Sequence, residues 1–329
     1  MKYLTLIMMI ASAMTLSCGN AKSGHQGGEQ TVPMQVVVPS FNADSAYSYV
    51  KRQVDFGPRV PGSDGHKACA AWLEQKLAGF GAKIYKQNVQ LQRYDGALLD
   101  AVNIIASFDP DNVKRVMLCA HWDTRPWADN DDDPANHHTP ILGANDGGSG
   151  VGVLLEVARQ IAAAKPAVGI DIMLFDAEDS GTPRFDNDDY DDRSWCLGAQ
   201  YWAHNPHRQG YTARYGLLLD MVGAADAVFY REGFSQDYAP SVIDKVWDKA
   251  AQLGYSHLFV NDFAGYISDD HVPVNEIARI PCIDIIHNDP TTTGFGTFWH
   301  TVDDDMDIID KQMLGIVGTV VLNVIYNEK

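Results

Sequence analysis

Apolar and polar residues follow two different periods along this chain, and each period predicts one kind of element. Apolar residues three and four places apart, as in the segment after Ser63, predict amphipathic helices, here one capped by Ser63 or Asp64. Short unbroken apolar runs predict buried strands. In chain order we predict a helix at 44–54, a helix from about 64 to 79, a hairpin around 89–105, a strand at 116–119, a helix at 151–164, a strand at 170–175, a helix at 194–203, a strand at 215–219, a helix at 242–253, a strand at 283–286 and a closing helix at 307–326.

The order of these elements favours one α/β architecture. Helices and strands alternate, and most strands are apolar throughout, which is typical of a largely parallel sheet covered on both faces. The chain has 329 residues, of which 46% are hydrophobic, so it is long enough to bury a large core. We therefore predict a single three-layer α/β/α domain over residues 41–329, with a mixed but mostly parallel central sheet.

The amino terminus has the features of an export signal. Lys2 precedes an apolar run over residues 4–16 that is too short to span a bilayer. The segment that ends at Cys18 resembles a bacterial lipoprotein signal, although cleavage by ordinary signal peptidase is the alternative. Residues 1–18 are thus predicted to be a signal peptide with Cys18 as the lipidated first mature residue, and the Gly- and Ser-rich residues 19–40 a flexible tether. We expect an exported, periplasmic lipoprotein of a Gram-negative bacterium, attached to the membrane only through the lipid on Cys18.

The charge balance excludes two classes of partner. The chain carries 25 Lys and Arg against 43 Asp and Glu, a net charge of -18. Such a surface repels nucleic acid and anionic lipid. One acidic run, Asp186–Asp192, is a candidate Ca²⁺ site, with a solvated acidic loop as the alternative. Beyond Cys18 the cysteines are Cys69, Cys119, Cys196 and Cys282; the two in strand-like runs, Cys119 and Cys282, are read as free core thiols, and the sequence assigns no disulfide.

Polar residues suited to metal binding follow the predicted strands at their carboxyl ends. Ligands of parallel sheets gather at this edge. Taken singly, each residue has an ordinary explanation: Asp146, which lies among glycines, is as well suited to capping a helix as to binding a metal. Taken together, their placement predicts a metal-centred active site built from His121, Asp146, Glu178, Asp179, Asp220 and His300.

The motifs that contain these residues resemble those of the zinc aminopeptidase clan, and within it most closely the glutaminyl cyclases. The resemblance runs in order from about residue 44 to the end. It is carried by His121-Trp-Asp123, Gly143-Ala-Asn-Asp146-Gly-Gly-Ser-Gly150, Glu178-Asp179, Leu219-Asp220, Asp269-Asp-His271-Val-Pro273 and Trp299-His300-Thr301, with support from Pro58-Arg-Val-Pro-Gly-Ser63, Asn103-Ile-Ile105 and Ile280-Pro281.

The resemblance implies a catalytic zinc site. It places the zinc ligands on Asp146, Asp179 and His300, and the general acid/base on Glu178. Three protein ligands leave the fourth position of Zn²⁺ open for substrate. The implied reaction is cyclisation of an N-terminal glutamine of peptides or proteins to pyroglutamate, with release of ammonia.

The alternative implied by the same clan is an aminopeptidase with two zinc ions. Its ligands would fall on His121, Asp146, Asp179, Asp220 and His300, all of which are present. The residue at 269 favours the cyclase, because the peptidases usually have a small residue there, whereas in the cyclases the matching Asp bonds to the residue that matches Asp220. Two carboxylates in contact share a proton, which makes Asp220 a poor ligand and leaves one zinc per chain. Asp220 and Asp269 would then orient Glu178.

The substrate pocket is predicted to include Trp299, Trp195 and His121. Trp299 adjoins a predicted ligand. Trp195 follows an insertion, Ser180–Ser194, that has no counterpart in the animal cyclases, and it has an alternative role as a core residue at the start of a helix. The chain also departs from the animal cyclases at Asp284, where they have a histidine, and at Asp179, where they have a glutamate.

Overall fold

The computed structural model describes residues 36–189 and 192–329, and its centre is a six-stranded sheet with the order β1-β2-β4-β3-β5-β8. β3, β4, β5 and β8 run parallel, whereas β1 and β2 form an antiparallel hairpin at one edge, with β2 antiparallel to β4. The predicted mixed, mostly parallel sheet is confirmed. The strands are β1 (Lys83–Gln92), β2 (Leu98–Phe108), β3 (Arg115–His121), β4 (Gly169–Phe175), β5 (Gly216–Asp220) and β8 (Cys282–Ile286).

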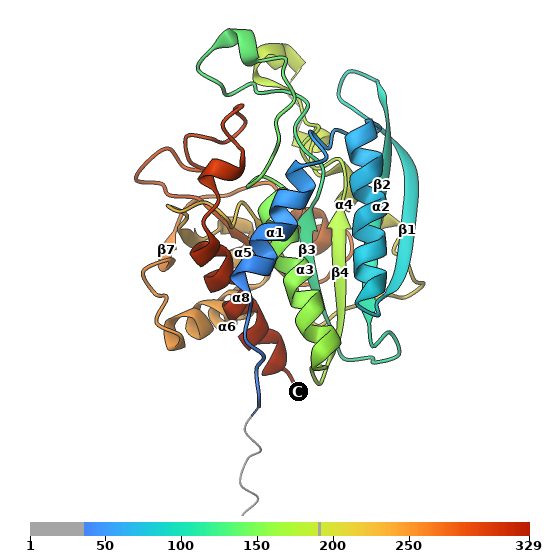
Figure 1. The fold of residues 1–329 in the computed structure, drawn as a ribbon, viewed down its shortest axis with the longest axis vertical. Helices are drawn as coiled ribbons and strands as arrows, with labels where there is room; N and C mark the ends of the chain where they lie inside the picture. The colour runs from blue at the N-terminus through green and yellow to red at the C-terminus, as the bar shows by residue number, and fades with distance from the viewer. Residues whose placement is uncertain (1–35, 190–191) are drawn as a thin grey trace, which may run out of the picture. The chain divides into compact units, whose positions relative to one another are not determined.

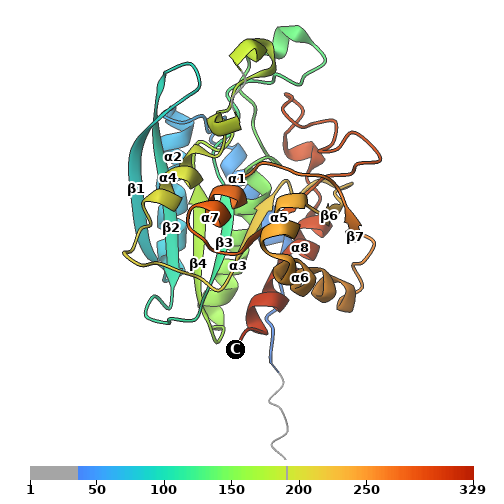
Figure 2. The same ribbon diagram turned by 180° about the vertical axis from the view of Figure 1, so that it is seen from behind.

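Helices cover both faces of this sheet (Figures 1 and 2). One face packs α1 (Ala43–Val54), α2 (Asp64–Gly79), α3 (Gly148–Ala163) and α8 (Lys311–Tyr326), with α6 (Pro240–Gln252) beside α8. The other face packs α4 (Leu197–His204), α5 (Gly233–Tyr238) and α7 (His271–Glu276). Neighbouring residues of β3 enter different cores, since Leu118 packs on the first face and Met117 on the second. Both faces are buried, as the apolar strands predicted.

Several elements differ from the prediction, each for a local reason. A small parallel pair, β6 (Phe229–Arg231) with β7 (Phe259–Phe263), was not predicted because its residues lack an apolar run. The closing helix begins at Lys311 because the Asp310 side chain caps it, accepting from the Met313 N–H. Residues 306–308 form a separate 3₁₀ turn. The helix predicted at 194–203 likewise begins only at Leu197, after a 3₁₀ turn.

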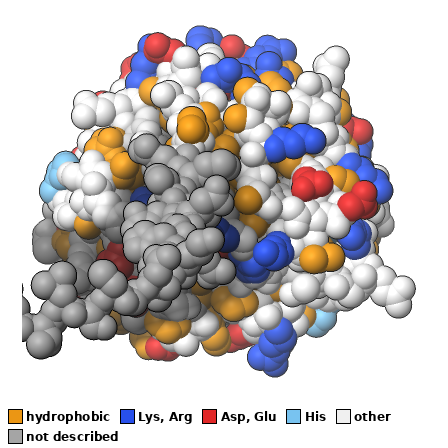
Figure 3. All heavy atoms as spheres, turned by 90° about the horizontal axis from the view of Figure 1, so that it is seen from below, with side chains coloured by type: hydrophobic (Ala, Val, Ile, Leu, Met, Phe, Trp, Pro, Cys, Tyr) orange, Lys and Arg blue, Asp and Glu red, His pale blue; other side chains and the backbone are white. Residues whose placement is uncertain are grey.

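Predictions about the amino terminus fall outside the described residues. These are the signal peptide 1–18, the lipidated Cys18 and most of the tether. Among the described residues, no helix has the length and apolar character needed to cross a membrane. The four cysteines after Cys18 are buried and free. The surface at the amino ends of the parallel strands shows Lys and Arg side chains scattered among apolar and neutral ones (Figure 3).

Candidate active site

The carboxyl ends of the parallel strands deliver the predicted site residues to one place. β3 ends at His121, β5 ends at Asp220, and the chain beyond β4 supplies Glu178 and Asp179. One pocket is lined by carboxylates, a histidine and aromatic side chains: Asp146, Glu178, Asp179, Trp195, Asp220, Asp269, Phe295, Trp299 and His300 are among its walls. Residues far apart in the sequence thus form a single site, as the motifs predicted.

Asp146 does not cap the helix that follows it. The N-cap of α3 is Gly147, which makes no side-chain capping bond. Gly147 has a φ of 81°, and a Cβ there would lie 2.6 Å from the Asp123 carbonyl oxygen, so the turn requires glycine. Asp304 fixes the backbone by accepting the N–H groups of Asn145 at 2.7 Å and Asp146 at 3.0 Å. The Asp146 carboxylate is thereby free to point into the site.

Asp146, Asp179 and His300 have the spacing of a metal site. His300 Nε2 lies 3.5 Å from Asp146 Oδ2 and 3.2 Å from Asp179 Oδ1. Ligands bound tetrahedrally at about 2.0 Å from Zn²⁺ are roughly 3.3 Å apart, so this set fits zinc. Asp179 Oδ2 is buried without a hydrogen-bond partner. Burial, together with Arg125, lowers the pKa of His300 well below its usual value, which keeps its nitrogen lone pair available to a metal.

Arg125 and Asp129 support these ligands, and neither was predicted. Arg125 donates to both oxygens of Asp129 at 2.6 and 2.7 Å, and its Nη1 donates to Asp179 Oδ1 at 3.2 Å. His300 Nδ1 lies 3.7 Å from Asp129 Oδ1. Such outer partners orient metal ligands. A signal was present, since Arg125 and Asp129 lie four residues apart in the acidic loop 122–133, but Asp179 and His300 lie far along the chain.

A second set of possible ligands adjoins the first and shares Asp146. His121 Nε2 lies 3.0 Å from Asp146 Oδ1 and 3.3 Å from Asp220 Oδ1. The other ring nitrogen of His121 contacts Asp123 Oδ1 at 3.4 Å. Burial alone would lower the pKa of His121, but these three carboxylates raise it well above its usual value. His121 was predicted in the pocket wall; instead it lies behind Asp146 and Asp220, because β3 is central in the sheet.

Glu178 precedes Asp179 along the chain, and both line the pocket. Asp123 holds the backbone between them, with its two oxygens accepting from the Glu178 N–H at 3.1 Å and the Asp179 N–H at 3.2 Å. The Cys196 thiol donates to Glu178 Oε1 at 3.3 Å. Burial and the negative charges of Asp269 and Asp179 raise the pKa of Glu178 well above its usual value, against the opposing effect of His121. A carboxyl group with a raised pKa is suited to proton transfer near neutral pH.

Asp269 and Asp284 are close neighbours, with carboxylate oxygens within 4.8 Å of each other. Burial together with the charge of Asp269 raises the pKa of Asp284 well above its usual value. The bond from Asp269 to Asp220 that the resemblance implies stays a prediction. Burial raises the pKa of Asp220 to about 7. The negative charge of Asp269 contributes to this rise, and His121 opposes it. The position where the animal cyclases have histidine therefore holds a buried carboxyl group whose pKa is raised.

Two tryptophans flank the histidine of the site. The ring of Trp299 stacks on His300 with a centroid separation of 3.9 Å, and Trp195 lies parallel to His300 at 6.0 Å. Both tryptophans line the pocket. Trp195 precedes α4, which begins at Leu197, so its predicted role in the pocket agrees with its position.

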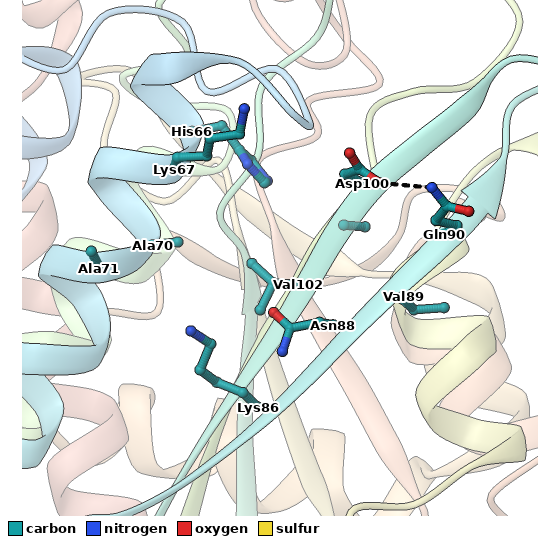
Figure 4. Close-up of a pocket in the computed structure, with 11 residues that line it drawn as sticks. His66, Lys67, Ala70, Ala71, Lys86, Asn88, Val89, Gln90, Asp100 and Val102 are labelled. Carbon is teal, nitrogen blue, oxygen red and sulfur yellow. Dashed lines mark hydrogen bonds between the residues drawn. The ribbon is translucent and has the colours of Figure 1, made fainter.

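Other features lie apart from this site. A separate hollow between α2 and the β1–β2 hairpin is lined by Lys67, Lys86 and Asp100, the last of which accepts from Gln90 at 3.0 Å (Figure 4). None of the predicted catalytic or metal-binding residues lines it. The candidate calcium run Asp186–Asp192 includes residues 190–191, which lie outside the described part of the chain.

Comparison with known proteins assigns the chain to a family. The sequence profile of Peptidase family M28 matches residues 103–325, and the chain belongs to this family. The glutaminyl cyclase of Bacteroides thetaiotaomicron, solved bound to N-acetylhistamine, is 57% identical; the match covers 89% of this chain and all (100%) of that one, with a TM-score of 0.88. This chain is also 56% identical to a structure described as a leucine aminopeptidase precursor of the same species, with 90% and 100% of the two chains covered and a TM-score of 0.87.

A more distant relative is an aminopeptidase. Aminopeptidase YwaD of Bacillus subtilis is 28% identical over 235 residues, which are 68% of this chain and 44% of that protein. This chain thus spans less than half the length of that relative. Family M28 and the glutaminyl cyclases are zinc-dependent, and the chain has the buried ligand groups that such a metal needs.

Proposed function

We propose that this protein is a zinc-dependent glutaminyl cyclase that converts the N-terminal glutamine of peptides or proteins to pyroglutamate and releases ammonia. The observation that carries the proposal is the single pocket in which Glu178 faces the set Asp146, Asp179 and His300 beside Trp299. The 57% sequence identity of this chain to a solved glutaminyl cyclase supports the same reaction.

Asp146, Asp179 and His300 are the proposed holders of one zinc ion. When bound there, zinc would polarise the γ-carbonyl of the glutamine and stabilise the negative charge that develops on its oxygen. Arg125 fixes Asp179, and Asp304 fixes the backbone of Asp146, so the ligands are held in place before the metal binds.

Glu178 is the proposed general acid and base. Its carboxylate accepts a proton from the neutral α-amine of the substrate as the amine nitrogen forms a bond to the γ-carbonyl carbon. Glu178 returns the proton to the amide nitrogen as the carbon–nitrogen bond breaks and ammonia leaves. The Cys196 thiol, which donates to Glu178 Oε1, orients the carboxylate. Because the attack closes a five-membered ring within one molecule, the site has only to orient the amine and stabilise charge.

An aminopeptidase is the second candidate, and a specific arrangement favours it. His121, Asp146 and Asp220 form a second set of neighbouring ligand atoms, as a two-zinc enzyme requires. Against this, burial and the nearby Asp269 raise the pKa of Asp220 to about 7, so it is not a fully ionised ligand at neutral pH. We therefore favour one zinc per chain, with Asp220 and Asp269 positioning Glu178.

Two substrates and a metal count separate these functions. The protein is incubated with a Gln-initiated peptide and with leucine amide, while zinc per chain is measured. We expect pyroglutamate and ammonia from the first substrate, no leucine from the second, and about one zinc. Release of leucine by a protein that binds two zinc ions would instead establish the aminopeptidase.

We propose further that the protein acts in the periplasm as a lipoprotein anchored at Cys18. The support is the sequence alone: a short apolar run that ends at Cys18 and is followed by a polar tether. Radiolabelled palmitate incorporated by the wild type and lost in Cys18→Ala would test it. The Ca²⁺ site at Asp186–Asp192 remains a prediction from its acidic composition, to be tested by calorimetry with Ca²⁺.

A further inference from the structure

A second hollow adjoins the metal pocket and shares three of its walls. Trp195, Trp299 and His300 line both spaces. The remaining walls of the second hollow, which we call the outer pocket, are Arg125, Asp129, Thr182 and Arg184. Because the two spaces share these walls, a peptide whose first residue occupies the metal pocket can place its following residues in the outer pocket.

The two arginines of the outer pocket are not equivalent. Arg125 is buried, and its charge is matched by Asp129, which it binds through both oxygens, and by Asp179. Arg184 is exposed, and its guanidinium carbon lies 5.6 Å from the centre of the Trp299 ring. Asp129 accepts only the backbone N–H of Arg184, at 2.8 Å. The outer pocket therefore has one guanidinium that no carboxylate of its walls neutralises, in a chain with a net charge of -18.

The backbone around Arg184 is anchored, so its side chain has a defined origin. The ring of the adjacent Phe185 packs against Trp127 at 6.1 Å and His138 at 4.4 Å between ring centres. Tyr94, in the turn between β1 and β2, packs in turn against Trp127, with 5.9 Å between ring centres. Segments from three parts of the chain therefore hold Arg184 at the rim of the site.

We propose that Arg184 is a specificity-determining residue that favours peptides with an acidic side chain directly after the N-terminal glutamine or one place further. The inference rests on the proposed cyclase function. A carboxylate of the peptide would approach the guanidinium over the Trp299 ring, and a lysine at the same place would be repelled. Arg184 lies in the Ser180–Ser194 insertion, which has no counterpart in the animal cyclases that the sequence resembles.

The test compares kcat/KM for three peptides that differ only after the glutamine: Gln-Glu, Gln-Gln and Gln-Lys, each extended by the same neutral residues. The zinc-loaded wild type at low salt is expected to prefer Gln-Glu over Gln-Lys by about fivefold to tenfold, and salt should reduce the ratio. Arg184→Gln should bring the ratio to within about twofold, and Arg184→Glu should invert it. The matched control is Arg208→Gln, since Arg208 lies on another surface, bonded to the Pro110 carbonyl.

The ratio separates the possible failures. A variant that folds poorly loses activity on all three peptides together and leaves the ratio unchanged, so the metal content and melting temperature of each variant are measured alongside. A wild-type ratio near one, or a ratio that survives in correctly folded Arg184→Gln, would overturn the role of Arg184. Absence of pyroglutamate from all three peptides with the wild type would reject the cyclase function itself.

Discussion

The site has two regions rich in carboxylates, which we call the ligand half and the acidic half, and the carboxylates have different neighbours in each. In the ligand half, Asp146 and Asp179 converge on the neutral imidazole of His300, and Arg125 adds a positive charge. In the acidic half, Asp220, Asp269, Asp270 and Asp284 are all buried, and among the described residues only Asp220 of these four has a salt-bridge partner, His121, whose Nε2 lies 3.3 Å from Asp220 Oδ1. Burial raises the pKa of each of these four groups.

This contrast teaches how one fold can hold a metal and a proton side by side. Where carboxylates converge on a neutral histidine, a cation is the favourable partner. Where they converge on one another, they keep protons instead, because neighbouring ionised carboxylates repel in a buried site. Glu178 lies at the border, where it can exchange a proton with a substrate held by the ligand half.

Removing the metal should have the largest effect on activity and stability, because the carboxylates of the ligand half are expected to need a cation. Treatment with a zinc chelator is expected to abolish turnover and to lower the melting temperature, since Asp146 and Asp179 then repel without a cation. A free zinc concentration a thousandfold above the Kd stabilises the folded state by about 4 kcal/mol. Calorimetry with and without chelator, followed by zinc addition, measures this. An unchanged melting temperature would contradict the assigned ligands.

The Glu178→Gln substitution should have the next largest effect. The amide cannot accept a proton, so kcat on a Gln-peptide is expected to fall by about 10³-fold, while zinc content stays the same. Activity within about tenfold of the wild type, a barrier change of about 1.4 kcal/mol, would remove Glu178 from the mechanism. Metal analysis of the same sample distinguishes a lost base from a lost metal.

The Asp269→Ser substitution should allow Asp220, in the acidic half, to bind a metal. Without the charge of Asp269, the pKa of Asp220 falls from about 7, and Asp220 becomes an ionised partner for His121 and Asp146. Zinc per chain is expected to rise from about one towards two. The control is Asp111→Ser, since Asp111 is exposed and remote from the site. Equal zinc content in the two variants would show that Asp269 does not exclude the second metal.

The smallest effect concerns the pH dependence of metal-free protein. The pKa of Asp220 is raised by folding to about 7, so its contribution to stability is present at low pH and is lost as the pH rises through that value. Asp220→Asn should flatten the fall in unfolding free energy between pH 5 and 8 by about 2 kcal/mol. Chemical denaturation at several pH values measures the slope. A slope as steep in the variant as in the wild type would assign the proton to another group.

The fold was largely predictable because its elements follow local patterns. Uninterrupted apolar strands require cover on both faces, and amphipathic helices such as α1 supply it. The β6–β7 pair escaped prediction because its short strands, such as Phe259–Phe263, are largely exposed and depend on contacts between distant segments. The observed first residue of a helix differs from the predicted one where a capping side chain such as Asp310, and not the apolar periodicity, sets the start of the helix.

By itself, the sequence predicted Asp146, Asp179 and His300 as ligands through its resemblance to the glutaminyl cyclases, and the structure brings these three residues together because motifs after strands of a parallel sheet meet at one edge. Only the tertiary structure decided what surrounds those ligands. The bonds of Arg125 to Asp179 and of Cys196 to Glu178 join residues from different elements or loops. Such contacts depend on the relative placement of loops and on the burial that shifts each pKa, and neither is written in the period or spacing of residues along the chain.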